Sequence, residues 1–295
     1  MPQVQANGIQ IEATRVGDED APAILLIRGL GTQMCQWPAP FLDALARECQ
    51  VVTFDNRDVG LSQKFDEAGV PDLGSLISSG GSADVPYLIR DMAADCVGVL
   101  DAFGIERAHV FGMSMGGMIA QEVAGRFPER THSLISVMSS SGDPSVPPAT
   151  PEAMRVLTES PERPEDRDCV VELGLKGRRV VGSPGYVDSD EAVRRELGEA
   201  FDRCNHPQGV ARQMAAVIAS GSRVDLLRRV EAPTLVIHGK DDPLVHPEGG
   251  RNTAKHVPGA RLEEIEGMGH DLPSGLLPKL VELVLDHARK AGAPS

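Results

Sequence analysis

"HVFGMSMGGMIA", residues 109–120, places Ser114 between Gly112 and Gly116, at the point where an apolar run gives way to small residues. The glycines permit a tight turn from a strand into a helix, which would lift the serine hydroxyl above the edge of a sheet. In this setting G-x-S-x-G is typical of a nucleophilic serine, although a glycine-rich turn with a capping serine would give the same letters. The choice between them depends on whether the chain supplies a base and an acid.

The sequence on either side alternates between strand and helix patterns. Short apolar runs that predict strands lie at 23–27, 50–55, 108–112, 132–138, 234–239 and 260–266. Helical patterns lie at 41–49, from Leu88 to Leu100, and at 114–127, 247–256 and 275–290. An Asn7-Gly8 pair between two alternating runs predicts an N-terminal β-hairpin. We therefore expect an α/β fold, with a mostly parallel central sheet flanked by helices.

One segment breaks the alternation. Residues 141–222 are rich in Pro, Glu and Arg, and they show helical patches without a convincing strand. We expect this segment to be an inserted helical cap, and residues 1–140 and 223–295 to form the core.

Composition limits the classes of partner. The formal net charge of −14 argues against nucleic acids and anionic membranes, because their phosphates would be repelled. Aromatic residues make up only 3 % of the chain, so a pocket would be lined mainly by aliphatic and methionine side chains. The five cysteines form no C-x-x-C pair, which indicates neither a disulfide framework nor a zinc site. Without a signal-peptide pattern or a membrane-spanning apolar run, we expect a cytoplasmic protein.

His270 is the best candidate for the base that a nucleophilic serine requires. It lies in "EGMGHDLP", a glycine-bearing loop between the last expected strand and the last helix, from which an imidazole can reach the top of the sheet. His109 and His238 fall in or at the end of strands, where a core role is more economical. The other histidines lie in polar surroundings typical of a protein surface.

The acid should follow a strand and come between the serine and the histidine. "VIHGKDDPLVHP" offers Asp241 and Asp242 directly beyond a strand end. With Asp242 the order along the chain is Ser114, Asp242, His270, which is the order of one of the several folds that carry this triad.

From end to end the chain resembles an α/β-hydrolase. G-K-D-D-P at 239–243 matches the G-x-x-D-P turn of that family, which implies that Asp242 is the triad acid; Asp143 is a further option, because some members carry the acid there. "FDNRDVGLS" (54–62) resembles the D-x-R-G-x-G-x-S turn, with Asp58 where glycine is usual. Together with "GMGHDLPSG" it is similar to the aclacinomycin methylesterase-like branch, whose members hydrolyse a carboxylic ester.

The loop after the strand at 23–27 departs from the family pattern. The family usually has His-Gly there, and this chain has Arg28-Gly29. The resemblance implies an oxyanion hole made by the backbone N–H groups of Leu30 and Met115, which the loss of a side chain does not remove. What braces the loop, and whether Arg28 adds positive potential, are left open.

The resemblance implies a serine carboxylesterase that acts on a small-molecule ester through an acyl-enzyme intermediate, with no cofactor and no metal. We expect Gly29, Met34 and Met113 to line a substrate pocket suited to neutral esters, although Met113 fits a core position equally well. Lactonases, carbon–carbon bond hydrolases and perhydrolases use the same triad, and a non-catalytic receptor can share the fold. Gly29-x-Gly31 is a poor dinucleotide fingerprint, because position 34 is not glycine.

Overall fold

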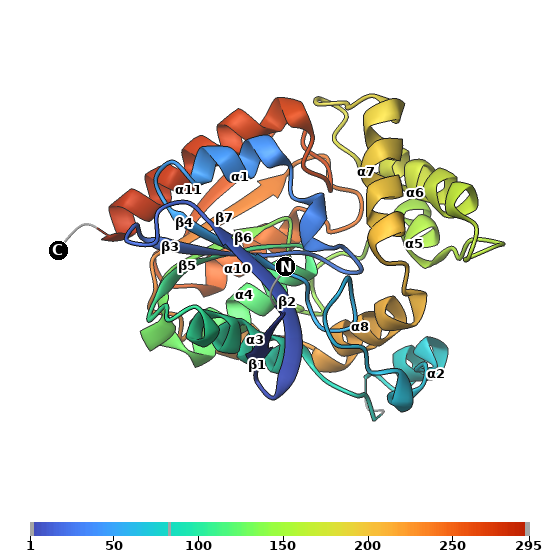
Figure 1. Ribbon diagram of the computed structural model, residues 1–295, viewed down its shortest axis with the longest axis horizontal. Helices are drawn as coiled ribbons and strands as arrows, with labels where there is room; N and C mark the ends of the chain where they lie inside the picture. Colours follow the sequence, from blue (N-terminus) through green and yellow to red (C-terminus); the bar gives the residue numbers. More distant parts are fainter. Residues whose placement is uncertain (1–2, 82–83, 293–295) are drawn as a thin grey trace.

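The computed structural model describes residues 3–81 and 84–292, which form an eight-stranded sheet with helices on both faces (Figure 1). The strands are β1 Gln3–Ala6, β2 Ile9–Val16, β3 Ala23–Ile27, β4 Gln50–Phe54, β5 Ala108–Met113, β6 Thr131–Val137, β7 Thr234–Gly239 and β8 Arg261–Ile265. Their order in the sheet is β1-β2-β4-β3-β5-β6-β7-β8. β2 pairs antiparallel with β1 and β4, and the strands from β4 to β8 run parallel. The predicted fold class and N-terminal hairpin are confirmed.

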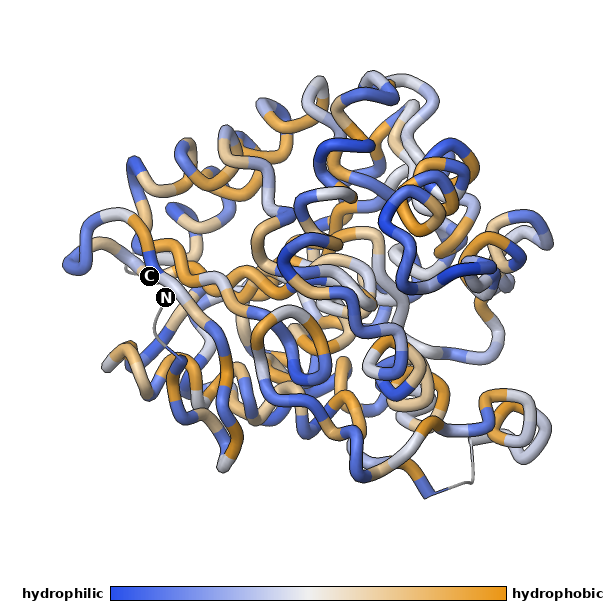
Figure 2. Tube along the Cα trace, turned by 45° about the vertical axis from the view of Figure 1, so that its right-hand side comes forward, coloured by the Kyte–Doolittle hydropathy of each residue, from blue (hydrophilic) through white to orange (hydrophobic). Residues whose placement is uncertain are grey.

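Two apolar clusters cover the two faces of the sheet. α1 (Ala39–Leu45) and α11 (Leu277–Gly292) pack on one face, and α3 (Ile89–Ala102), α4 (Met115–Arg126), α9 (Val224–Leu227) and α10 (Glu248–His256) pack on the other. Successive residues of β3 alternate between the two clusters, as the pleat requires: Leu25 and Ile27 face α3 and α4, whereas Ile24 and Leu26 face α1 and α11. Figure 2 shows hydrophobic residues along the central strands and an alternation with hydrophilic ones along the helices.

Further helices lie beyond the carboxyl ends of the strands, at the right of Figure 1. They are α5 Pro151–Thr158, α6 Arg167–Val181, α7 Asp190–Arg203 and α8 Pro207–Ser220, with α2 Leu73–Ser78 beside α8. Side chains of Thr150, Asp166 and Ser189 cap the first backbone N–H groups of α5, α6 and α7. Residues 141–222, which are all described, contain α5, α6, α7 and α8 and no strand. We propose that the segment acts as a cap.

Some boundaries differ from the sequence-based expectation. The helix expected at 41–49 begins at Ala39 and ends at Leu45, because the chain must turn through the next four residues to enter β4. α6 was not expected, because charged residues interrupt its apolar spacing, yet Val171 and Leu175 are buried, and the helix packs on α7. None of the helices among the described residues is long and apolar enough to cross a membrane.

Candidate active site

Ser114 stands on a sharp turn between β5 and α4. Its backbone has φ +55° and ψ −123°, a conformation that non-glycine residues rarely adopt. The flanking glycines allow the strand and the helix to approach closely: a Cβ on Gly116 would lie 2.2 Å from the carbonyl oxygen of Ile27, and one on Gly112 would lie 2.0 Å from that of Gly116. The turn therefore fixes the serine hydroxyl at the carboxyl end of the sheet, the position that the sequence predicts.

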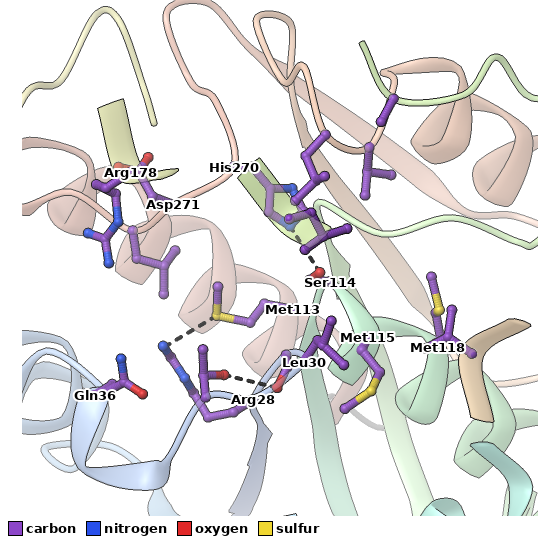
Figure 3. Close-up of a pocket in the computed structure, with 18 of the residues that line it drawn as sticks. Arg28, Leu30, Gln36, Met113, Ser114, Met115, Met118, Arg178, His270 and Asp271 are labelled. Carbon is purple, nitrogen blue, oxygen red and sulfur yellow. Dashed lines mark hydrogen bonds between the residues drawn. The ribbon is translucent and has the colours of Figure 1, made fainter. Parts of the chain in front are cut away.

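Ser114, His270 and Asp242 form one hydrogen-bonded chain. Nε2 of His270 lies 2.9 Å from Oγ of Ser114, a hydrogen bond that is drawn as a dashed line in Figure 3. Nδ1 of His270 lies 2.7 Å from Oδ2 of Asp242. Oδ1 of Asp242 accepts hydrogen bonds from the N–H groups of Leu244 and Val245, both at 2.9 Å. A carboxylate at Nδ1 favours the tautomer that leaves Nε2 free to accept the serine proton.

The surroundings of Asp242 keep it ionised. Its side chain is buried, which alone would raise its pKa, but the imidazoles of His270 and His238 together hold the pKa of this carboxyl well below its usual range. His238 approaches Oδ2 to 3.5 Å and donates its Nε2 hydrogen to the carbonyl of Val245. A carboxylate with a lowered pKa at this position can stabilise a positive charge on His270.

The other two candidate acids have different partners. Asp241 accepts a hydrogen bond from the N–H of Gly267 at 2.8 Å. Asp143 accepts one from Nδ2 of Asn252 at 3.1 Å. The structure thus brings Ser114 and His270 together with Asp242, and it gives the carboxylates of Asp241 and Asp143 structural contacts elsewhere.

The loop that follows β3 passes directly over the serine. A Cβ on Gly29 would lie 3.2 Å from the Cβ of Ser114, so this loop needs glycine to come so near. Leu30 follows in the loop, and Met115 is the first residue of α4, so its N–H lacks an acceptor within the helix. Both residues line the same cavity as Ser114. The oxyanion hole that the resemblance implies at their N–H groups stays a prediction.

Hydrogen bonds from three places brace this loop in the absence of the usual histidine. Nδ2 of Asn56 donates to the carbonyl of Arg28 at 3.0 Å, and Oγ1 of Thr32 donates to that of Gly29 at 2.9 Å. Oε1 of Gln213, on α8, accepts the hydrogen of the Gly31 N–H at 2.9 Å. Part of the support for the loop therefore comes from the segment proposed as a cap.

A cavity of about 440 Å³ opens above the serine. Ser114 and His270 form part of its wall, and most of the remaining wall is apolar. The apolar lining residues are Leu30, Pro38, Met113, Met115, Met118, Pro148, Ala149, Met154, Leu157, Met214, Val217, Leu244, Val245 and Leu272. Charged and amide side chains also line it, namely Arg28, Gln36, Arg178, Glu196 and Asp271. In Figure 3 Gln36, Arg178 and Asp271 lie on one side of the cavity, and Met115 and Met118 lie on the other.

Two of the three expected pocket residues line this cavity. Gly29 does so, and Met113 both lines it and packs in the core behind it, with 8 % of its surface exposed. The expectation for Met34 is wrong: its N–H is held by Asp55, and its side chain packs in the core beside Trp37. The sequence could not show this, because a short 3-10 turn at Met34–Gln36 redirects the side chain.

The sequence did not indicate several of the residues that line the cavity. Met118 lies three positions after Met115 on α4, so helical spacing from the nucleophile would have identified it. Arg178, Glu196 and Met214 come from α6, α7 and α8, respectively, and nothing in their local sequence indicates which face of a helix meets the cavity. Across residues 3–81 and 84–292, no group of three or more His, Cys, Asp or Glu side chains could hold a metal ion.

The chain was compared with known proteins. A family model described as "Alpha/beta hydrolase family" matches residues 24–277. A rhodomycin D methylesterase of Streptomyces peucetius is 30 % identical over 94 % of both chains. Among solved structures, a meta-cleavage product hydrolase of Pseudomonas fluorescens matches with a TM-score of 0.78 at 19 % identity, over 99 % of this chain and 98 % of the other. An enol-lactonase of Burkholderia xenovorans matches with a TM-score of 0.73 at 23 % identity, over 98 % and 100 %. The resemblance inferred from the motifs is confirmed.

Proposed function

This chain belongs to the alpha/beta hydrolase family, and from that premise we propose that it is a serine carboxylesterase acting on neutral carboxylic esters. The observation that carries the proposal is the hydrogen-bonded chain from Ser114 through His270 to Asp242, at the wall of a largely apolar cavity. The similarity to a methylesterase supports an ester as the bond that is cleaved.

In the proposed first half-reaction, Oγ of Ser114 attacks the ester carbonyl carbon while Nε2 of His270 takes the serine proton. The negative charge that develops on the carbonyl oxygen is stabilised by the N–H groups of Leu30 and Met115, and Asp242 stabilises the imidazolium. The tetrahedral intermediate then collapses. His270 donates the proton that it took from Ser114 to the departing alkoxide, so the alcohol leaves and an acyl-Ser114 ester remains.

In the second half-reaction a water molecule takes the place of the alcohol. Nε2 of His270 accepts a proton from this water, whose oxygen attacks the acyl carbonyl within the same oxyanion hole. Collapse of the second tetrahedral intermediate releases the carboxylic acid, and the proton returns from His270 to Oγ of Ser114. The backbone strain at Ser114 serves both steps, because it holds Oγ above the sheet throughout.

The cavity lining supports uncharged substrates. A charged group moved from water against the aliphatic and methionine side chains that make up most of the wall would lose its hydration there, which is costly. Methionine side chains adapt to varied apolar shapes, so the four that line the cavity beyond Met113 (Met115, Met118, Met154 and Met214) favour acyl groups of short to medium length.

Replacement of the nucleophile tests the proposal. Ser114→Ala should lower kcat on p-nitrophenyl esters by about 10³ or more, because the oxyanion hole alone retains little of the rate. The exposed Ser145→Ala is the matched control and should keep full activity. Near-normal activity of Ser114→Ala would contradict the mechanism. Activity on a panel of esters of graded acyl length and of lactones would identify the substrate class. If the folded protein binds esters but hydrolyses none of them, it is a receptor.

A further inference from the structure

Arg28 is a buried cation without an anionic partner. Only 5 % of its surface is exposed, and among the described residues Nε has no hydrogen-bond partner and no carboxylate lies within 4 Å of the guanidinium. Nη1 contacts the thioether sulfur of Met113 at 3.5 Å, and the guanidinium lies over the ring of Trp37 at 4.7 Å. A thioether is a weak acceptor and an aromatic face a modest one, so the hydrogen-bonding capacity of this side chain is largely unused.

The charge on Arg28 persists despite this environment. Burial lowers the pKa of the guanidinium to about 10, which still leaves it protonated at neutral pH. Buried charges in proteins are normally paired and hydrogen-bonded, because an unpaired one forfeits its hydration. Arg28 therefore lies in a position that an oxygen acceptor would stabilise.

The position of Arg28 makes the substrate the natural source of that acceptor. The residue lines the same cavity as Ser114 and His270, and it directly precedes Gly29, over the nucleophile. In Figure 3 its guanidinium points from the loop toward Met113, on the side of the cavity where Gln36 is drawn. A substrate whose ester carbonyl meets Ser114 can extend another group toward this side.

The neighbouring charges indicate that the acceptor is uncharged. Glu196 is already paired with Arg178 at 3.1 Å and accepts from Gln36 at 3.3 Å, and Asp271 accepts from Ser183. Arg28 and Arg178 line the same cavity as these two carboxylates, so the charges of its wall nearly cancel. A further carboxylate would be repelled by them, whereas a neutral oxygen could accept from Arg28 without adding charge.

We propose that Arg28 binds the substrate by donating hydrogen bonds to a second, uncharged carbonyl oxygen, so that the protein prefers esters that carry a keto group. The inference rests on the proposed function and deepens it, since it names a feature of the substrate. A hydrogen bond to a charged donor contributes roughly 1.5–3 kcal/mol, which corresponds to a preference of about tenfold to a hundredfold.

Paired substrates test the proposal. kcat/KM should be measured for methyl hexanoate, for methyl oxohexanoates with the keto group at successive carbons, and for the monomethyl ester of adipic acid. The native protein should prefer one of the keto esters to methyl hexanoate by about tenfold or more. In Arg28→Met that ratio should fall to near one, and in Arg28→Lys, which keeps the charge but not the planar fork, it should be intermediate. Arg179→Met, which removes an exposed arginine of α6, should leave the ratio unchanged.

A binding measurement distinguishes the role of Arg28 from the proposed esterase activity, because it does not depend on turnover. Calorimetric titration of Ser114→Ala with the preferred keto ester needs no turnover, and the Kd should rise about tenfold or more when Arg28→Met is added. Arg28→Gln replaces Arg28→Met should the latter not fold. Equal affinity for keto and plain esters, with and without Arg28, would overturn the proposal, and a preference for the adipate monoester would overturn the uncharged acceptor. Absence of turnover with intact keto-ester binding would contradict only the esterase mechanism.

Discussion

Asp241 and Asp242 are adjacent in sequence, and their carboxylates hold opposite sides of one turn. Asp242 turns inward to His270, and Asp241 turns outward to the backbone of the loop that carries His270. Both residues thus contribute to the position of the imidazole, but only Asp242 touches it. The two aspartates differ in their proposed chemical role as well as in geometry, because the proposed triad acid must remain charged next to the imidazole of His270.

Substitution of each aspartate by asparagine tests this distinction. Asp242→Asn should lower kcat by about 10³ or more, because an amide at Nδ1 favours the tautomer in which Nε2 cannot accept the serine proton. Asp241→Asn and Asp143→Asn, measured with the same ester, are the matched controls and should retain most of the activity. A larger loss in either control than in Asp242→Asn would move the acid role to that residue.

At single positions, the sequence was informative where a residue type is tied to a turn. Ser114, His270 and Asp242 each follow a strand in a short motif, so their convergence at one sheet edge could be predicted. Met34 could not be placed, because its direction depends on a 3-10 turn and on the bond from its N–H to Asp55. Arg28 was identified as a departure, but its lack of a partner depends on contacts between distant segments.

Helix α8 links the proposed cap to the core through two neighbouring residues. Arg212, which is 1 % exposed, donates to both carboxylate oxygens of Asp58 at 2.8 and 2.9 Å. Asp58 occupies the position where the family usually has glycine. Its backbone has φ +69°, a left-handed conformation that glycine adopts readily. The unusual aspartate therefore has a physical role, since the buried ion pair fixes α8 against the turn that follows β4.

The next residue of α8 supports the loop that follows β3, where we propose the oxyanion hole. Oε1 of Gln213 accepts from the N–H of Gly31, and Nε2 donates to the carbonyl of Arg57 at 2.7 Å. Both partners belong to loops of the core, so the amide spans the gap between them. Alternation of strands and helices predicted the sheet, but a contact of this kind joins residues far apart in sequence and leaves no local pattern.

Removal of this amide should slow the reaction without unfolding the protein. In Gln213→Ala the loop loses a brace next to the oxyanion hole, and we expect kcat to fall by roughly tenfold or more, with a smaller change in KM. Gln208→Ala, at an exposed position of the same helix, is the control. Unchanged kcat together with weakened stability would show that Gln213 only holds α8 in place.

On the scale of the whole molecule, the two ends of the sheet serve different purposes. The carboxyl ends of the parallel strands carry the proposed triad. The opposite end holds the buried histidine His109 on β5, with His132 on β6 and His287 on α11 near it. Nδ1 of His109 lies 2.9 Å from Oγ of Ser133, and 2 % of the residue is exposed. Because this end lies opposite Ser114 in the sheet, we expect these histidines to affect the stability of the fold and not turnover.

The histidines at this end should make the protein sensitive to acid. Burial, aided by the nearby His132 and His287, lowers the pKa of His109 to about 4, and burial also lowers the pKa values of His132 and His287. An unfolded chain would protonate these rings near pH 6.5, so between pH 6.5 and 4 the unfolded state binds more protons than the folded state. The stabilisation is fully present above about pH 6.5 and is lost as the pH falls toward 4.

Denaturant unfolding at a series of pH values measures this loss. For His109 alone, the free energy of unfolding should fall by about 2 kcal/mol between pH 7 and 5. His109→Asn keeps a polar group near Ser133 but cannot be protonated, so its free energy of unfolding should decline less steeply over this range, whatever its absolute stability. Because His109 lies at the end of the sheet opposite to Ser114, kcat of the folded variant at pH 7 should match that of the native protein. Parallel pH profiles for the two proteins would show that His109 does not carry the acid sensitivity.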